Sequence, residues 1–389
     1  MADPGQRPAS LDALVASKEI VIACGSGGVG KTTTAAALAV MAAVHHGGKV
    51  LVVTVDPARR LASALGLSGF GNVEKRVPAS AFAAAGVEPR GELWAAMLDT
   101  KQSWDDLVRR HAPDADTRDK ILANPLYQNI AGRFVQSHDY IAMERLYELH
   151  STGRFDLVVV DTPPTRNAVD FIEAPERMAE FFSSRLLRLL IAPYRSRVLN
   201  LASKPFYQVA DRILGSQFLG DIAEFFILFQ TMYAGFVERA RAVERLLHDP
   251  RTTFVVVSTL EAAPVREAEY FIDVLAGKRF SLGALVLNRV LPRYLLDEAA
   301  RERAADLCRR AAEVAADVAP AVDADPALLE RVLGEVGDNY ANFSVVARRE
   351  AAQRRALATT PEVVAAVPEF DADIHDLTGL LALGERIWG

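Results

Sequence analysis

The chain is poor in the patterns that build disulfide-bonded, cysteine-zinc and membrane-spanning proteins. Its 389 residues include two cysteines, Cys24 and Cys308, and no CxxC pair, which excludes a disulfide framework and argues against a cysteine-zinc site. No run of 18 or more apolar residues is present, so no membrane-spanning helix is predicted. The formal net charge of −6 gives no basic excess, which argues against nucleic acid as a partner.

The first residues also lack a targeting pattern. Residues 1–10 contain no basic stretch followed by an apolar core, so they are predicted to be a flexible tail rather than a signal peptide. The remainder, 11–389, is predicted to be one domain. The cysteine usage predicts a cytoplasmic protein. If the protein meets a membrane, it is expected to do so through a partner or by binding reversibly to the membrane surface.

What the chain does contain is a series of short, continuous Val/Ile/Leu runs between helical patterns. Continuous runs are typical of parallel strands that are covered on both faces, and their alternation with helices predicts an α/β, doubly wound, mainly parallel sheet. Ligands of such sheets bind at the carboxyl ends of the strands. The runs lie at 19–24, 50–55, 93–98, 156–160, 253–257, 284–288 and 362–367.

Two stretches interrupt this alternation and read as almost entirely helical. Residues of about 100–152 and 170–250 are too long for simple crossovers, and they predict a helical subdomain packed beside the sheet. Within it, 181–191 and 218–237 are dense in Phe, Leu and Ile. Two interpretations stay open: these segments form the core of the helical subdomain, or they form an apolar client surface that responds to nucleotide.

The strongest motif is the run Gly25–Thr33, which follows an apolar strand pattern and precedes an Ala-rich helix pattern. It matches GxxxxGK[ST], in which glycines turn backbone N–H groups toward phosphates at a helix N-terminus. Lys31 is predicted to reach the terminal phosphates of ATP, and the Thr32 hydroxyl to bind Mg²⁺. The expected nucleotide-binding residues are Gly27, Gly28, Val29, Gly30, Lys31, Thr32 and Thr33.

Two aspartates follow predicted strands and complete the site. Asp56, after the second strand, is the candidate catalytic residue that orients or deprotonates a water for attack on the γ-phosphate. Asp161, after the fourth apolar run, is the candidate second Mg²⁺ anchor, directly or through water. Taken alone, an Asp before Pro57 would be read as a helix N-cap.

These motifs resemble the ArsA-type ATPases, a family of arsenite-pump and tail-anchored-protein-targeting ATPases related to the dimeric deviant-Walker proteins. The resemblance rests on Gly25–Thr33, Val55–Ala58 and Asp161–Thr165, which look like a deviant Walker A P-loop, switch I and switch II. It implies an ATPase that works as a dimer. It is strong at the nucleotide site and weak in the helical insert.

The resemblance also implies roles for three more residues. Glu261 corresponds to a family glutamate that touches nucleotide across the dimer, and Asn288 to the asparagine that reads adenine. Pro368 is expected to line the adenine pocket. From the residues alone, Glu261 and Asn288 would be read as ordinary loop and turn positions.

Departures from the family pattern separate the candidate functions. Ser26 stands where the family usually has a lysine that reaches into the partner's site, and Arg166 begins the pair that replaces a usual Gly-His. The leading prediction is an ATP-driven dimeric switch with a hydrophobic protein client or membrane-protein partner. The alternatives are a catalytic subunit of an anion-transport system and a low-turnover regulatory subunit. Ser26 leaves a homodimer and a heterodimer with a lysine-bearing paralogue both open. No zinc is expected.

Overall fold

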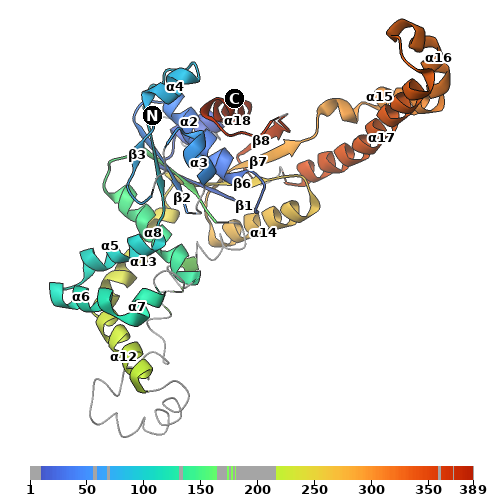
Figure 1. The fold of residues 1–389 in the computed structure, drawn as a ribbon. Helices are drawn as coiled ribbons and strands as arrows, with labels where there is room; N and C mark the ends of the chain where they lie inside the picture. The colour runs from blue at the N-terminus through green and yellow to red at the C-terminus, as the bar shows by residue number, and fades with distance from the viewer. Residues whose placement is uncertain are drawn as a thin grey trace.

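The structure is a computed structural model that describes residues 10–55, 59–67, 71–130, 135–163, 173–174, 177, 180, 216–357, 361–370 and 372–388. Its centre is an eight-stranded sheet in the order β3-β4-β2-β5-β1-β6-β7-β8 (Figure 1). All neighbouring strands are parallel except the β3–β4 pair. The strands are β1 (Ile20–Gly25), β2 (Lys49–Thr54), β3 (Lys75–Arg76), β4 (Glu92–Met97), β5 (Leu157–Asp161), β6 (Thr252–Ser258), β7 (Leu282–Val290) and β8 (Val363–Pro368).

This sheet confirms the predicted α/β class and mainly parallel topology. All seven apolar runs of the sequence correspond to strands, within a few residues at each end. The strand that the pattern missed is β3, whose two residues, Lys75 and Arg76, are exposed and charged. An antiparallel edge strand of this kind carries no apolar signal.

Alternating side chains along each buried strand supply two separate cores. On β1, Ile20, Ile22 and Cys24 join the core on one face of the sheet, whereas Val21 and Ala23 join the core on the other. The first core is covered by α8 (Val135–Ser151), α13 (Tyr233–Leu247) and α14 (Ala262–Lys278). The second is covered by α1 (Leu11–Ala16), α2 (Lys31–His45), α3 (Arg59–Ala64), α4 (Ala79–Ala84) and α18 (Leu377–Trp388).

Helices also gather beyond the edge of the sheet, where the sequence predicts helical stretches (Figure 1). Here α8 and α13 continue into a packed group with α5 (Thr100–His111), α6 (Ala115–Ala123), α7 (Pro125–Ile130) and α12 (Ser216–Gln230). Six rings form its centre, which we call the aromatic cluster. They are Trp104, Tyr127, Tyr140, Phe225, Phe229 and Phe236.

The aromatic cluster decides between the two interpretations of the apolar segment 218–237 at four positions. Phe225, Phe229, Met232 and Phe236 are 2–6% exposed, so they are core residues rather than a free client surface. The other apolar segment, 181–191, lies outside the described residues.

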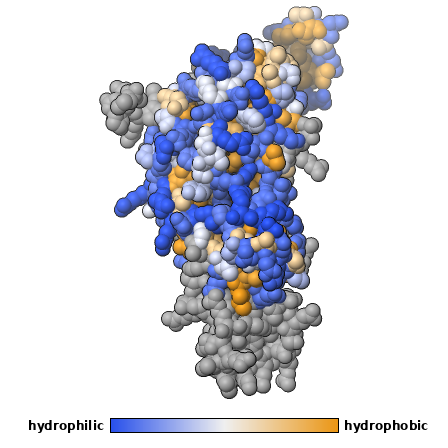
Figure 2. All heavy atoms as spheres, turned by 90° about the vertical axis from the view of Figure 1, so that its left-hand side faces the viewer, coloured by the Kyte–Doolittle hydropathy of each residue, from blue (hydrophilic) through white to orange (hydrophobic). Residues whose placement is uncertain are grey.

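A long helical projection after β7 is the feature that the sequence analysis did not anticipate. The 3-10 helix η1 (Arg293–Leu296) leads into α15 (Glu298–Arg309), α16 (Ala311–Val322) and the 32-residue α17 (Pro326–Leu357). We call residues 293–357 the arm. It extends away from the sheet, with α15 lying along α17 and α16 at the far tip (Figure 1). The face of the molecule opposite the arm is mainly hydrophilic, and apolar residues reappear on the arm tip behind it (Figure 2).

Among the described residues, no helix combines the length and the apolar character needed to cross the hydrocarbon core of a membrane.

Candidate nucleotide site

The P-loop connects the carboxyl end of β1 to the first turn of α2, as the motif predicts. Gly28 and Gly30 have φ angles of 81° and 89°, which only glycine adopts without strain. Gly30 has a second constraint, because a Cβ atom there would collide with the side-chain amide of Asn288. Lys31 is the first residue of α2, so the loop's N–H groups lie at a helix N-terminus.

Lys31 and Asp161 form a buried ion pair between α2 and the end of β5. The Lys31 Nζ lies 3.1 Å from Asp161 Oδ1, and their side chains are 8% and 0% exposed. Lys31 also donates to the backbone oxygen of Thr162. Burial of a charge is costly unless it is paired and hydrogen-bonded, so this arrangement holds Lys31 at a defined position.

Two hydroxyl groups share the other oxygen of the same carboxylate. Thr32 Oγ1 donates to Asp161 Oδ2 over 2.6 Å, and Thr54 Oγ1 donates to it over 3.0 Å. The Asp161 carboxylate therefore joins three parts of the sheet edge: the P-loop helix, the end of β2 and the end of β5. Sequence reasoning predicted Lys31, Thr32 and Asp161 but not Thr54, because a single polar residue at the end of an apolar strand is not a specific signal.

The oxygens of Thr32 and Asp161 fit the preference of Mg²⁺ for hydroxyl and carboxylate ligands. Within the described part of the chain, no group of three or more His, Cys, Asp or Glu side chains is arranged to hold a metal ion. The fit is that of a nucleotide-bound Mg²⁺, which takes one or two protein oxygens and leaves the rest to phosphate and water.

Asn288 lies against the P-loop, although 258 residues of sequence separate it from Gly30. It occupies the end region of β7, and its Nδ2 donates to the backbone oxygen of Val29 over 2.8 Å. Its Oδ1 accepts from the N–H of Arg289 over 3.0 Å. The amide is thus anchored to the loop that is predicted to hold phosphate.

The structure describes the positions of only some of the remaining predicted residues. Pro368 ends β8 opposite Val290 of β7, and Glu261 directly precedes α14 with an exposed side chain. Asp56 and Arg166 lie outside the described residues, so the predicted switch I carboxylate has no described position.

Two small residues beside the site are buried. Ser26 is 8% exposed. Burial raises the pKa of the Cys24 thiol to about 12, so this thiol stays protonated and is not a nucleophile.

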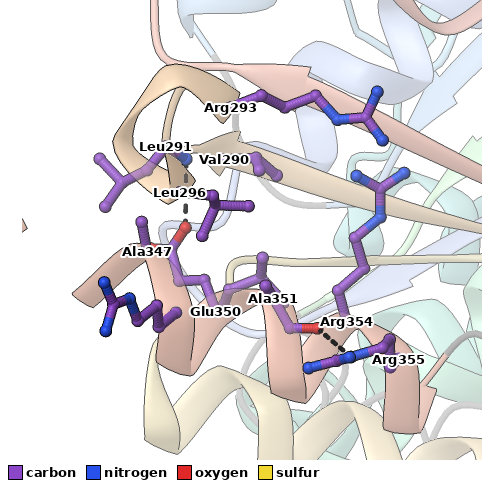
Figure 3. A pocket seen from close by; sticks show the side chains of 11 residues that line it. Val290, Leu291, Arg293, Leu296, Ala347, Glu350, Ala351, Arg354 and Arg355 are labelled. Carbon is purple, nitrogen blue, oxygen red and sulfur yellow. Dashed lines mark hydrogen bonds between the residues drawn. The ribbon is translucent and has the colours of Figure 1, made fainter. Parts of the chain in front are cut away.

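A pocket that sequence reasoning did not foresee adjoins this edge. It has a volume of about 650 Å³ and lies between the end of β7 and the base of α17 (Figure 3). Arg293 and Arg354 reach toward each other across it, while the Glu350 carboxylate accepts from the N–H of Leu291 over 3.1 Å. Burial raises the pKa of Glu350, and the negative charges of Glu261 and Glu369 act in the same direction.

Together, the parallel sheet and the loop at the end of β1 define a P-loop nucleotide-binding protein of the α/β class. The family model described as "Anion-transporting ATPase" matches residues 18–316. The chain belongs to this family, and it is an ATPase of the ArsA type.

Curated relatives agree with this assignment. The "ATPase ASNA1 homolog" of Entamoeba dispar is 24% identical over 298 residues, covering 73% of this chain and 81% of the relative. The "ATPase GET3" of Komagataella phaffii is 24% identical over 278 residues, covering 69% and 71%. The "ATPase GET3" of Candida dubliniensis is 26% identical over 282 residues, again covering 69% and 71%. The family match ends at residue 316, so α17 lies beyond it.

Proposed function

We propose that this chain is an ATP-driven dimeric switch that couples its nucleotide state to a partner-binding surface. The observation that carries the proposal is the sharing of Asp161 by Lys31, Thr32 and Thr54. One carboxylate ties the phosphate-binding helix to the ends of two strands. A change at Lys31 or Thr32 therefore reaches both segments that follow those strands.

The residues present fit ATP with Mg²⁺. The backbone of Gly27–Thr33 would hold the phosphates, Thr32 would bind Mg²⁺, and Asp161 would bind it directly or through water. Asn288 would read the adenine edge, with Pro368 beside the base and Glu261 reaching nucleotide across the dimer. The Mg²⁺ would supply neutralisation of charge on the β- and γ-phosphates.

Lys31 is the moving part of this switch. Its ammonium donates to the carbonyl of Thr162, whose hydroxyl in turn donates to the Ala23 carbonyl over 2.9 Å. Thr162 is the first residue after β5. When Lys31 turns toward phosphate, it gives up its hydrogen bond to the Thr162 carbonyl. The turn that follows Asp161 then becomes free to rearrange, and this is the change we assign to the nucleotide cycle. Asp56 would orient the attacking water.

The test is nucleotide binding by Lys31→Ala, measured by calorimetry with Mg²⁺ and ATP. We expect loss of binding, because the variant removes the cation directed at the β- and γ-phosphates. The matched control is Lys49→Ala, which removes an exposed lysine at the start of β2. Circular dichroism must show that both variants fold. Wild-type affinity in a folded Lys31→Ala would refute the site.

Ser26 determines which dimer we propose. A cation supplied in trans to a phosphoryl-transfer site can be worth roughly 10³–10⁵ in rate, and a buried serine cannot supply one. We infer that a homodimer turns over slowly and that a lysine-bearing paralogue completes the site of this chain. Turnover of the pure chain, of its Ser26→Lys variant and of mixtures with paralogues tests this. Fast turnover of the pure homodimer that Ser26→Lys does not improve would contradict it.

The pocket supports a second candidate, the catalytic subunit of an anion-transport system. Arg293 and Arg354 face each other there, and among the described residues no ion pair joins either one to a carboxylate. Two guanidinium groups on opposite walls suit a small oxyanion. The test is whether an oxyanion stimulates ATPase activity. If it does, the stimulation should be lost in the double variant Arg293→Gln, Arg354→Gln. Absence of any such stimulation removes this candidate.

A further inference from the structure

The long helix α17 has an inner face that packs on the rest of the arm. Ser344 is fully buried and its hydroxyl donates to the Leu295 carbonyl over 2.9 Å. Gly337 is also buried, and a Cβ atom there would lie 2.8 Å from the backbone oxygen of Ala304 on α15. The contact between α15 and α17 is therefore close, and it covers the inner face of α17.

A second face of α17 carries apolar residues that nothing in the described structure covers. Val332, Val336, Phe343 and Val346 are 43%, 54%, 52% and 46% exposed, and Asn339 between them is exposed as well. We call these five residues the seam. Their spacing is four, three, four and three residues, which is the heptad pattern of a helix that packs against another helix.

The seam is separate from the inner face. At 3.6 residues per turn, it lies roughly 130° around the helix from Gly337 and Ser344. Leu329, three residues before Val332, continues the same pattern toward the arm tip. Isolated apolar residues on a surface are ordinary, but a continuous stripe with coiled-coil spacing on a preformed helix indicates a helical partner.

We propose that the seam pairs in antiparallel fashion with the seam of a second copy of this chain. The charges beside the seam are self-complementary. Glu335 precedes Asn342 by seven residues and Arg349 follows it by seven, and all three occupy the same flanking position of the heptad. A two-fold axis near Asn342 brings Glu335 of each copy beside Arg349 of the other.

The same register pairs two of the apolar residues with each other and places Val332 opposite Glu350 of the second copy. It places Val336 opposite Val346 of the second copy, and Phe343 opposite Asn339 next to the axis. A parallel arrangement would instead place Arg349 beside Arg354 of the second copy, which like charges disfavour. The Glu335 carboxylate is only loosely engaged within its own helix, 3.9 Å from Arg331 in an exposed pair that contributes little.

This contact differs from a dimer that closes across two nucleotides. The seam lies along the projecting arm, and none of its residues belongs to the nucleotide site (Figure 1). The base of α17 nevertheless contacts the chain just after Asn288, because the Glu350 carboxylate accepts from the Leu291 N–H over 3.1 Å. Because the seam includes no residue of the nucleotide site, the arm pairing is expected to form without nucleotide. Its antiparallel arrangement places the two sheets at opposite ends of the paired helices.

A disulfide trap tests the register directly. Asn342→Cys should crosslink to a covalent dimer under mild oxidation, in the full-length chain with Cys308→Ser and with EDTA present to remove Mg²⁺. Val345→Cys is the matched control, because Val345 is 62% exposed but lies on another side of the helix. Equal crosslinking of both variants, or none of Asn342→Cys, would overturn the proposal.

Charge reversal tests the partner. We expect Glu335→Arg alone and Arg349→Glu alone each to raise the dimer dissociation constant several-fold, and the double variant to restore it. Val336→Asp with Val346→Asp should raise it by tenfold or more, measured by analytical ultracentrifugation without nucleotide, whereas Val345→Asp should leave it unchanged. A monomer in all forms, or dimerisation only with a paralogue, contradicts self-pairing. ATP binding by each variant reports separately on the nucleotide site.

Discussion

The aromatic cluster and the arm use apolar side chains in opposite ways. In the aromatic cluster, Phe225 and Phe229 have ring centroids 4.7 Å apart and are almost fully buried. On the arm, Phe343 is half exposed, at the centre of a stripe on a helix whose other face is already packed. The sequence suggests the reverse, because 218–237 is dense in Phe, Leu and Ile whereas 326–357 is rich in Arg and Ala.

The difference shows that apolar density does not report exposure. The helix α12, which is apolar on nearly all sides, packs on α6 and α7 of its own chain. A helix with a narrow apolar stripe and charged flanks can pack that stripe against a second helix, from the same chain or from another. The arm is therefore a further candidate for a partner surface, beside the segment 181–191 that lies outside the described residues.

Truncating one ring in each region gives the largest expected effect. Phe229→Ala should lower the free energy of unfolding by about 3–5 kcal/mol, because it leaves a cavity among closely packed rings. Phe343→Ala should change it by no more than about 0.5 kcal/mol in dilute samples, because the ring is half exposed. Urea unfolding followed by circular dichroism measures both. Equal losses would mean that the two regions do not differ.

The sheet and most of its edge were predictable because their determinants are local in sequence. Each parallel strand is buried on both faces, so it needs a continuous apolar run, as in Leu157–Val160. The P-loop is set by glycines at positive φ followed directly by Lys31 and Thr32. Resemblance supplied Asn288, whose contact with Val29 no local pattern reports.

The arm was not predictable for the opposite reason. Its helices α15 and α17 are held by a contact between Gly337 and Ala304 that depends on small residues far apart in sequence. Its heptad spacing is visible in 332–346, but Ala and Arg dilute the apolar signal around it. Sequence reasoning also passed over Thr54, because one polar residue at the end of a strand has no specific pattern.

Breaking one ion pair in each region sharpens the comparison. Glu144 and Arg239 form an ion pair beside the aromatic cluster, with side chains 8% and 14% exposed. Arg239→Met should cost about 3–5 kcal/mol, because it leaves the buried Glu144 carboxylate without its cation and, among the described residues, with only the Tyr140 hydroxyl as a partner. On the arm, Arg348 lies 2.9 Å from Glu298 in a pair that is 41% and 58% exposed. Arg348→Met should cost less than about 1 kcal/mol.

The pH dependence of the stability of Arg239→Met is the control for this prediction. Burial already raises the pKa of Glu144, and Arg239 opposes that rise, so removing the arginine should raise the pKa further. A carboxyl group whose pKa is higher in the folded than in the unfolded state contributes stability below pH 4.5, which is lost as the pH rises through the folded pKa. Thermal unfolding of the variant should therefore improve toward acid pH relative to wild type. A pH-independent difference would point to lost packing instead.

The smallest expected effect concerns His111, in the last turn of α5 at the edge of the aromatic region. Burial, with Arg239 and Arg110 nearby, lowers the pKa of His111 to about 4. The unfolded chain then binds a proton that the folded chain rejects between pH 6.5 and 4, so stability should fall as the pH drops through this range. The arm, residues 293–357, contains no histidine, so mild acid should loosen the aromatic region first. Hydrogen exchange at pH 7 and pH 5 should show this order. His111→Gln should reduce the difference, whereas His375→Gln, at an exposed site in the loop between β8 and α18, should not. Equal loosening of the arm would mean that its stability follows the aromatic region rather than its own contacts.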